Sequence, residues 1–414
     1  MVLRGWSWEA ALGPAGQGDR PLLEALAAAI PDEAVKATIE ATGTRERRRR
    51  RLPTHLVVTL VIGMGLWASE SMRHVLAEVV AGWREGAASE RSAWRLPSTA
   101  AIVQARQRAG ARLLRELFHA VARPIATART RGAFLGGLRL MAVDGTTLDV
   151  ADTPENDRAF GRPTTGRGVG AFPQVRVLAL IETGTHAICD AVIRPFRSGE
   201  VPTALRLLRS VGPGMLLLWD RGFHSYELVR ATLERRAHFL GRTKKNVVLR
   251  PTEVLTDGSF LARIYPSPDA RRRDVRGIEL RVVEYALDTP AGPGRETYRL
   301  ITSLLDERAF PAEQLAATYH ERWEIETALD EVKVHQWAHP RPLRSKRPRE
   351  VVQEVYGLLL AHLAIRTVMH QAALHEGIDP DRLSFTGALR VLRRAIPRAQ
   401  RTPPERLPLF RPAC

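Results

Sequence analysis

The sequence is poor in cysteine, which excludes folds that are stabilised by disulfide bonds or by zinc bound to cysteines. Only Cys189 and Cys414 occur among 414 residues, and neither has a His or Cys neighbour at ligand spacing. A disulfide framework and a cysteine zinc site are therefore excluded. Any metal ion that the protein binds is expected to be held by oxygen atoms.

Long apolar runs are also missing. A membrane-spanning helix needs roughly 20 apolar residues, whereas the best stretch, residues 56–68, is shorter and contains Thr59 and glycines. We therefore predict a buried helix there and no membrane partner. The N-terminus carries Arg4 and Asp19 without a sustained apolar stretch, so we expect no signal peptide and a cytoplasmic location.

Acidic side chains are fewer than basic ones, 45 against 62, which leaves a formal charge of +17. This excess predicts a polyanionic partner, with nucleic acid ahead of an anionic membrane surface. The length of 414 residues and the 44% of hydrophobic residues are enough for two or three domains.

The first 130 residues have helical periodicity. Apolar residues recur at helical spacing over 20–40 and 53–90, and the basic run 47–51 separates the two stretches. Ser98 is expected to cap a further helix. We predict a helical DNA-binding domain over residues 1–130, with a solvated polar face as the alternative use of its polar side chains. Those on the third helix are Gln104, Arg106, Gln107, Arg108 and Arg112.

From residue 138 the pattern changes to short apolar strands. LRLMAV predicts a strand, QVRVLALIE and HAICDAVIRPF a hairpin, and MLLLW and AHFLGRT two further strands. Helices are expected from about Glu200 and from about Ser225 to Arg236. Strands that alternate with helices in this way predict an α/β fold with a mixed sheet. Residues 131–245 are the first part of this core.

Two β-rich runs, IELRVVEYAL and ETYRLITSLL, interrupt the core and predict an antiparallel insertion over residues 246–307. Helical pattern then returns from Pro311 to about Lys333 and from Arg349 to His375. We assign residues 308–376 to the second part of the core. Residues 377–414 are expected to be a basic C-terminal tail that is extended beyond Pro403.

Two aspartates follow apolar strands. Asp144 precedes Gly-Thr-Thr, and Asp220 precedes Arg-Gly. If the two strands are neighbours, the carboxylates converge at the edge of the sheet, where α/β proteins usually place their chemistry. The alternative is that each aspartate only caps a turn. Asp149 and Asp152 are nearby substitutes for Asp144.

The stretch from Tyr319 to Lys333 is predicted to be one helix. At about 100° per residue, four side chains fall within a wedge of about 60°: Tyr319, Arg322, Glu326 and Lys333. Glu324 and Glu331 point away from this wedge, whereas Asp330 shares it and is a reserve candidate. Glu326 is therefore the best third acid.

This face suits phosphoryl transfer. A carboxylate holds metal, the Arg322 fork holds phosphate, and Tyr319 and Lys333 reach neighbouring phosphates. The alternative is a surface helix with an ion pair between Arg322 and Glu326. Only five lysines occur in the chain, so a lysine at position 333 stands out. Three carboxylates without His or Cys select Mg²⁺ or Mn²⁺, and two such ions can activate a nucleophile and stabilise a leaving oxygen.

Further basic residues are candidates for contacts with backbone phosphate. Arg162 lies in the loop 152–171, which we expect to be mobile, and Lys244 and Lys245 follow a core strand. The alternative for the two lysines is a solvated strand end. His224, after Asp220, is expected to be structural or to contact DNA.

AVDGTTLDV, LLLWDRGFHSYEL and the Tyr-x₂-Arg-x₃-Glu-x₆-Lys spacing of YHERWEIETALDEVK resemble DDE transposases of the insertion element four family, which have an RNase H-like core. The resemblance spans most of the chain. It implies that Asp144, Asp220 and Glu326 form a catalytic triad with two Mg²⁺ or Mn²⁺ ions. It also implies cut-and-paste transposition in the bacterial nucleoid, with double-stranded terminal inverted repeats and target DNA as partners of a homodimer.

One feature departs from the family. Some relatives cut the second strand through a DNA hairpin and hold a flipped base on a tryptophan, but no Trp occurs between Trp219 and Trp323. Tyr285 or Tyr298 could stack a base instead, and core packing is the other use of either. Two alternative functions are a stand-alone RNase H-like nuclease and a catalytically decayed protein that only occupies inverted repeats.

Overall fold

The computed structural model describes residues 20–48, 50–81, 95–165, 168–244, 246–288, 295–321, 323–337 and 341–399. The chain divides into two compact units. The helical unit comprises residues 1–125, 148–175 and 330–414, and the sheet unit comprises residues 126–147 and 176–329.

The helical unit is built around one long helix, α13 (Pro348–Glu376), which packs against α1, α3 and α6. By length and composition α13 could cross a membrane, but 89% of its apolar window is buried within the protein, as expected of a core helix. Small residues let α3 and α13 approach closely, since a Cβ on Gly357 would lie 2.5 Å from the Val61 carbonyl oxygen. The N-terminal helices are α1 (Arg20–Ala29), α2 (Asp32–Ala41), α3 (Thr54–Leu66), α4 (Met72–Val79) and α6 (Thr99–Val121).

One local signal in this unit, the helix cap at Ser98, has the predicted structure. The Ser98 side chain accepts a hydrogen bond from the Ala101 amide at the start of α6, which confirms the predicted N-cap. Within the segment 152–171, expected to be a mobile loop, lies the short helix α7 (Pro154–Phe160), and the mobility of this segment stays a prediction. The segment also contains strands β3 (Thr164–Thr165) and β4 (Gly168–Val169), which pair with each other.

The C-terminal segments group differently from the sequence-based boundaries. Residues 348–376, expected in the core, pack as α13 with the N-terminal helices, because the apolar surface of α13 is covered by α1, α3 and α6. Residues 385–399, expected in a tail, form helix α14 (Phe385–Ala399), which packs on α13. The residues beyond 399 lie outside the described part of the chain.

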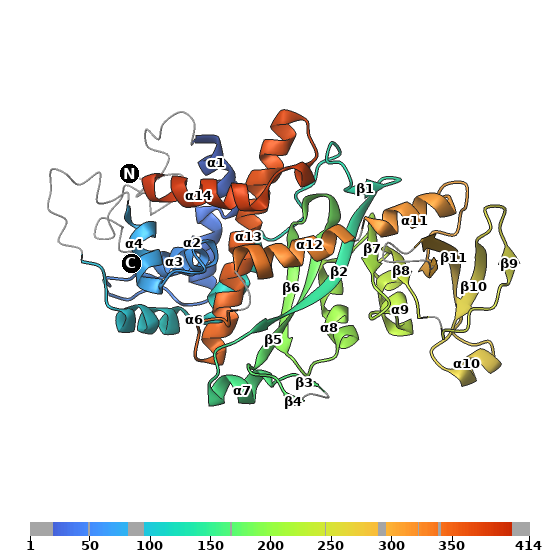
Figure 1. Cartoon of the computed structure of the whole chain (residues 1–414), viewed down its shortest axis with the longest axis horizontal. Coiled ribbons are helices and arrows are strands. Elements are labelled where there is room, and N and C mark those ends of the chain that lie inside the picture. Colours follow the sequence, from blue (N-terminus) through green and yellow to red (C-terminus); the bar gives the residue numbers. More distant parts are fainter. Residues whose placement is uncertain are drawn as a thin grey trace, which may run out of the picture. The chain divides into compact units, whose positions relative to one another are not determined.

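The sheet unit contains the core strands in the order β6-β5-β2-β7-β8 (Figure 1). β2 pairs in parallel with β7, and β7 in parallel with β8. Helix α8 packs on β6 and helix α9 on β8. This strand order is that of the RNase H-like fold, so the predicted α/β core is confirmed. The bounds are β2 (Leu138–Asp149), β5 (Gln174–Glu182), β6 (Ile188–Pro195), α8 (Glu200–Leu207), β7 (Met215–Trp219), α9 (Tyr226–Glu234) and β8 (His238–Arg242), with the short β1 (Phe134–Leu135) beside β2.

The β-rich insertion extends this same sheet. Its strand β12 (Arg295–Thr302) pairs antiparallel with β8, and β11 (Ile278–Asp288), β10 (Phe260–Ile264) and β9 (Glu253–Val254) follow in order. The predicted antiparallel hairpin is confirmed by the pairing of β11 with β12. Its turn, residues 289–294, lies outside the described residues. Helix α10 (Pro268–Arg272) follows β10, and α11 (Ala312–His320) packs on β8 and β11.

Candidate active site

Asp144 and Asp220 occupy adjoining positions, each directly after the last residue of the paired stretch of β2 and β7. The register of the parallel pair β2–β7 ends with Val143 opposite Trp219, and each aspartate is the next residue of its chain segment. The expectation that the two strands are neighbours is therefore confirmed. One detail differs, because β2 continues to Asp149, so that Asp144 lies within its strand and past the end of β7.

Close packing fixes the backbone beside each aspartate. The Trp219 ring is fully buried, stacks on Phe239 with centroids 5.2 Å apart, and leaves no room for a side chain at Gly241. A Cβ added to Gly241 would lie 2.1 Å from Trp219 Nε1. On the other strand a Cβ at Gly145 would lie 2.7 Å from Leu178 Cδ1. Gly241 and Gly145 therefore allow Trp219 and Leu178 to pack closely against the backbone of the strands beside the two aspartates.

The turn after Asp220 brings further polar groups together. The Phe223 amide donates to the Asp220 carbonyl, and Ser225 caps α9 by accepting from the Leu228 amide. Burial lowers the pKa of His224, and the positive charge of Lys244 lowers it further. His224 is therefore neutral at pH 7, in line with a structural role, and Lys244 lies close enough to influence this turn.

The two substitutes for Asp144 are engaged in the helical unit. Asp149 accepts a hydrogen bond from Gln174 Nε2 at 2.8 Å. Asp152 forms an ion pair with Arg162, which also pairs with Asp157 and donates to the Ala171 carbonyl oxygen. Arg162 is thus held by its own loop, and neither Asp149 nor Asp152 belongs to the unit that contains Asp220.

The expectation of one continuous helix from residue 319 to 333 is wrong. Helix α11 ends at His320, α12 (Trp323–Asp330) follows, and Glu331–Gln336 form a π-helical segment. A spacing of 100° per residue applies only along an unbroken α-helix, so a common face for the four side chains does not follow from their spacing in the sequence. Glu331 and Gln336 of the π-helical segment are both buried and contact α13, and these tertiary contacts favour the wider turn.

The contacts of this π-helical segment are charged and buried. Glu331 accepts from Arg366 Nε at 2.8 Å and lies 3.2 Å from His362 Nε2, while Gln336 donates to the Leu358 carbonyl oxygen. The Glu331 carboxylate is therefore bound to residues of α13. This agrees with the prediction that Glu331 is not a metal ligand.

The four residues of the predicted signature have different surroundings. Tyr319 is only 2% exposed, so that it is not a surface residue of the sheet unit. Glu326 is exposed on α12, and Lys333 is half-buried in the helical unit. Arg322 lies outside the described residues, as does Lys245.

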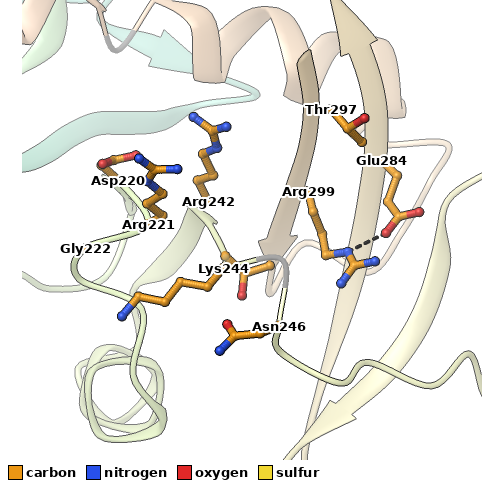
Figure 2. A pocket seen from close by; sticks show the side chains of 10 residues that line it. Asp220, Arg221, Gly222, Arg242, Lys244, Asn246, Glu284, Thr297 and Arg299 are labelled. Carbon is orange, nitrogen blue, oxygen red and sulfur yellow. Dashed lines mark hydrogen bonds and ion pairs between the residues drawn. The ribbon is translucent and has the colours of Figure 1, made fainter. Parts of the chain in front are cut away.

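A groove of about 750 Å³ opens beside Asp220. Figure 2 shows that its wall combines the turn after β7, the end of β8 and the insertion strands β11 and β12. Glu284 forms an ion pair with Arg299 across β11 and β12. The lining therefore has an excess of positive charge, which suits phosphate. Its charged residues are Asp220, Arg221, Arg242, Lys244, Glu284 and Arg299.

The tyrosines of the insertion are packed against each other. Tyr298 is 6% exposed and stacks on Tyr285, with ring centroids 5.2 Å apart, while Arg242 covers the Tyr298 ring at 4.1 Å. Both faces of Tyr298 are therefore occupied within the protein. For Tyr298 this arrangement is core packing, the second of the two uses considered, whereas Tyr285 is half-buried.

Sequence reasoning missed most of the basic lining of the groove. Arg221 directly follows Asp220 and Arg242 ends the strand before Lys244, so strand-end position was a usable signal for both. Arg299 carries no such signal, because only the pairing of β12 with β8 places it here.

The donor chemistry fits a hard divalent cation only in part. Asp144 and Asp220 offer carboxylate oxygens from adjoining positions, which Mg²⁺ and Mn²⁺ prefer. Within the described part of the chain, however, no three or more His, Cys, Asp or Glu side chains are gathered closely enough to hold a metal ion. Glu326 is therefore not assembled with the two aspartates in this conformation.

Known proteins resemble this chain along most of its length. A family model for the insertion element 4 transposase N-terminal region matches residues 20–119, and one for the transposase DDE domain matches residues 135–364. The Escherichia coli (strain K12) transposase InsG for insertion sequence element IS4 is 30% identical over 385 residues, 92% of this chain and 84% of that protein.

Among solved structures, a piggyBac transposase synaptic complex with hairpin DNA aligns with a TM-score of 0.48 and 13% identity, covering 91% of this chain and 80% of that chain. Kinship rests on the sequence matches, since the DDE-domain model spans more than half of the chain. The chain therefore belongs to the insertion element 4 family of DDE transposases.

Proposed function

We propose that this transposase cleaves transposon-end DNA and joins it to target DNA with Asp144, Asp220 and Glu326 as its catalytic acids. The observation that carries the proposal is the parallel pairing of β2 with β7, which sets Asp144 and Asp220 side by side. The basic groove that contains Asp220 supports it.

The acids are proposed to hold two divalent ions, Mg²⁺ or Mn²⁺. When bound, such ions activate water or a DNA 3′-hydroxyl and stabilise the leaving oxygen. Asp144 and Asp220 would supply the ligands that are already adjacent. Glu326, exposed on α12, would complete the set when metal and DNA are present, since the three acids are not gathered in this conformation.

The groove residues are proposed to hold the backbone of the strand that is cut. Arg221 and Arg242 present guanidinium forks that match phosphate oxygens, and Lys244 adds a point charge. Figure 2 shows the Lys244 side chain reaching toward the turn that carries Gly222. Lys245, Arg322 and Lys333 remain proposed DNA contacts. The burial of Tyr319 and the ion pairs of Arg162 favour structural roles for those two residues.

The proposed partners are double-stranded DNA of the terminal inverted repeats and of the target site. The relative from insertion sequence element IS4 is named as the transposase of that element, which supports this assignment. Because two transposon ends must be joined, we infer a homodimer in the synaptic complex. A cytoplasmic, nucleoid-associated location follows from DNA as substrate and from the charge of +17.

The test compares Asp144→Asn, Asp220→Asn and Glu326→Gln on a duplex that spans the element's own end. That end is found from short inverted repeats and a target duplication around the gene. Each variant should lose Mg²⁺-dependent cleavage and keep duplex binding. Asp152→Asn, an exposed acid paired with Arg162 in the helical unit, is the matched control and should cleave normally. Full cleavage by any one of the three variants removes that residue from the triad.

A further inference from the structure

A second groove, of about 790 Å³, lies within the helical unit. Four exposed arginines from three separate segments line it: Arg112 on α6, Arg158 on α7, and Arg347 and Arg349 at the start of α13. We call this the arginine groove. It contains none of the three acids, which all belong to the sheet unit.

The charge of the arginine groove is not neutralised locally. Among the residues that the structure describes, no ion pair joins any of the four arginines to a carboxylate, whereas Arg115 on the same helix pairs with Glu116. Two glutamates also line the groove. Glu155 is exposed, and the nearly buried Glu350 accepts a hydrogen bond from Gln107 Nε2 at 2.7 Å. Four exposed positive charges therefore face one exposed negative charge.

A buried polar network shapes the groove. Helix α6 is kinked at Gly110, whose φ of 72° favours glycine, and Gln353 Nε2 donates to the carbonyl oxygens of Arg106 and Gly110. Arg106, 2% exposed, in turn donates to Gln353 Oε1 at 2.9 Å and to Ser345 Oγ at 3.0 Å. These bonds tie the kink of α6 to the start of α13, so that the arginines of the two helices are held on one groove.

We propose that the arginine groove binds the sugar-phosphate backbone of duplex DNA. Arginine forks match phosphate oxygens bidentately, and several on one concave surface make a phosphate site without a metal ion. The positive end of α13, which begins at Pro348, adds to the local potential. Because the chain belongs to a transposase family, DNA is the polyanion that it is expected to meet. The proposal rests on that family membership and does not depend on which carboxylates are catalytic.

Phosphate contacts position a protein on DNA and carry no sequence information directly. The arginine groove should therefore bind the element end and an unrelated duplex of equal length alike. Loss of affinity for both duplexes identifies a general backbone contact, whereas loss for the end duplex alone overturns the proposal in favour of sequence readout.

The experiment measures fluorescence anisotropy of a labelled 30-base-pair duplex at several KCl concentrations, in EDTA. The protein carries Asp220→Asn, so cleavage plays no part in the signal and failure of the proposed triad leaves the result unaffected. The groove variant is Arg112→Gln with Arg349→Gln. The control variant, Arg115→Gln with Arg382→Gln, removes the same charge from exposed positions of the same unit outside the groove.

The association constant K for duplex DNA falls as salt is added, and each lost phosphate contact makes the slope of log K against log salt less steep by about 0.9. For the groove variant, the slope of log K against log salt should therefore become less steep by about 2. Its affinity at 0.1 M salt should fall by at least about ten-fold. The control should keep its slope and change affinity by less than about two-fold. An unchanged slope in the groove variant, or equal losses in both variants at unchanged thermal stability, overturns the proposal.

Discussion

A methyl group at Gly241 should damage both the stability of the sheet unit and the setting of Asp220. The added Cβ would lie 2.1, 2.3 and 2.7 Å from three atoms of the Trp219 indole. Real carbon contacts require roughly 3.5 Å, so the ring must move by about an ångström. Trp219 is fully buried and stacked on Phe239, and it directly precedes Asp220. Displacement of the ring therefore reaches the proposed catalytic carboxylate.

The magnitude follows from the packing. Overfilling a closely packed core costs about 1–3 kcal/mol, and a contact with a buried aromatic ring belongs at the upper end. Gly241→Ala should lower the free energy of unfolding by about 3 kcal/mol. Trp219→Leu in the same chain should relieve the clash, so that the double variant is more stable than the sum of the two single effects predicts.

The assay combines urea unfolding with cleavage at a temperature where the variant is folded. Gly212→Ala is the matched control, because a Cβ at Gly212 meets open space. It should be neutral or slightly stabilising. If Gly241→Ala matches the wild type in stability and cleavage, the packing of Trp219 does not position Asp220.

Two further predictions concern the helical unit. Glu331→Gln should lower the free energy of unfolding by about 3–5 kcal/mol, because the substitution leaves the buried charge of Arg366 uncompensated. Asp330→Asn, at the exposed neighbouring residue, should change the free energy of unfolding little in the same urea titration. Burial lowers the pKa of His55 to about 4. As the pH drops, His55 is therefore protonated in the unfolded chain before it is protonated in the folded one. The free energy of unfolding should fall by at most about 3 kcal/mol between a pH of about 6.5 and a pH of about 4. His55→Gln should flatten that pH dependence, and an equally steep profile in this variant would assign it to other groups.

Much of the core could be predicted because its signals are local. MLLLW and AHFLGRT are short apolar runs that became β7 and β8, and the Ser98 cap needs only the next three residues. The alignment of Asp144 with Asp220 followed from one assumption, that the two strands pair.

The rest depended on contacts between distant segments. The π-helical segment at Glu331 is accompanied by the buried pair with Arg366, 35 residues away in sequence, so helical periodicity gave no sign of it. Arg299 reaches the groove only through the pairing of β12 with β8. Likewise, the helical pattern of residues 348–376 was visible, but its partners α1, α3 and α6 were not.

We propose that Asp144, Asp220 and Glu326 hold divalent metal ions, and exchanging the metal in a variant of one of these ligands distinguishes this role from a structural one. Asp220→Cys replaces a hard oxygen ligand by a thiolate, which Mg²⁺ accepts poorly and Mn²⁺ accepts better. We expect this variant to bind the element end, to fail to cleave it in Mg²⁺ and to recover cleavage in Mn²⁺, while Asp220→Ala stays inactive in both. Equal cleavage by Asp220→Cys in the two metals, or recovery by Asp220→Ala, would contradict the proposal.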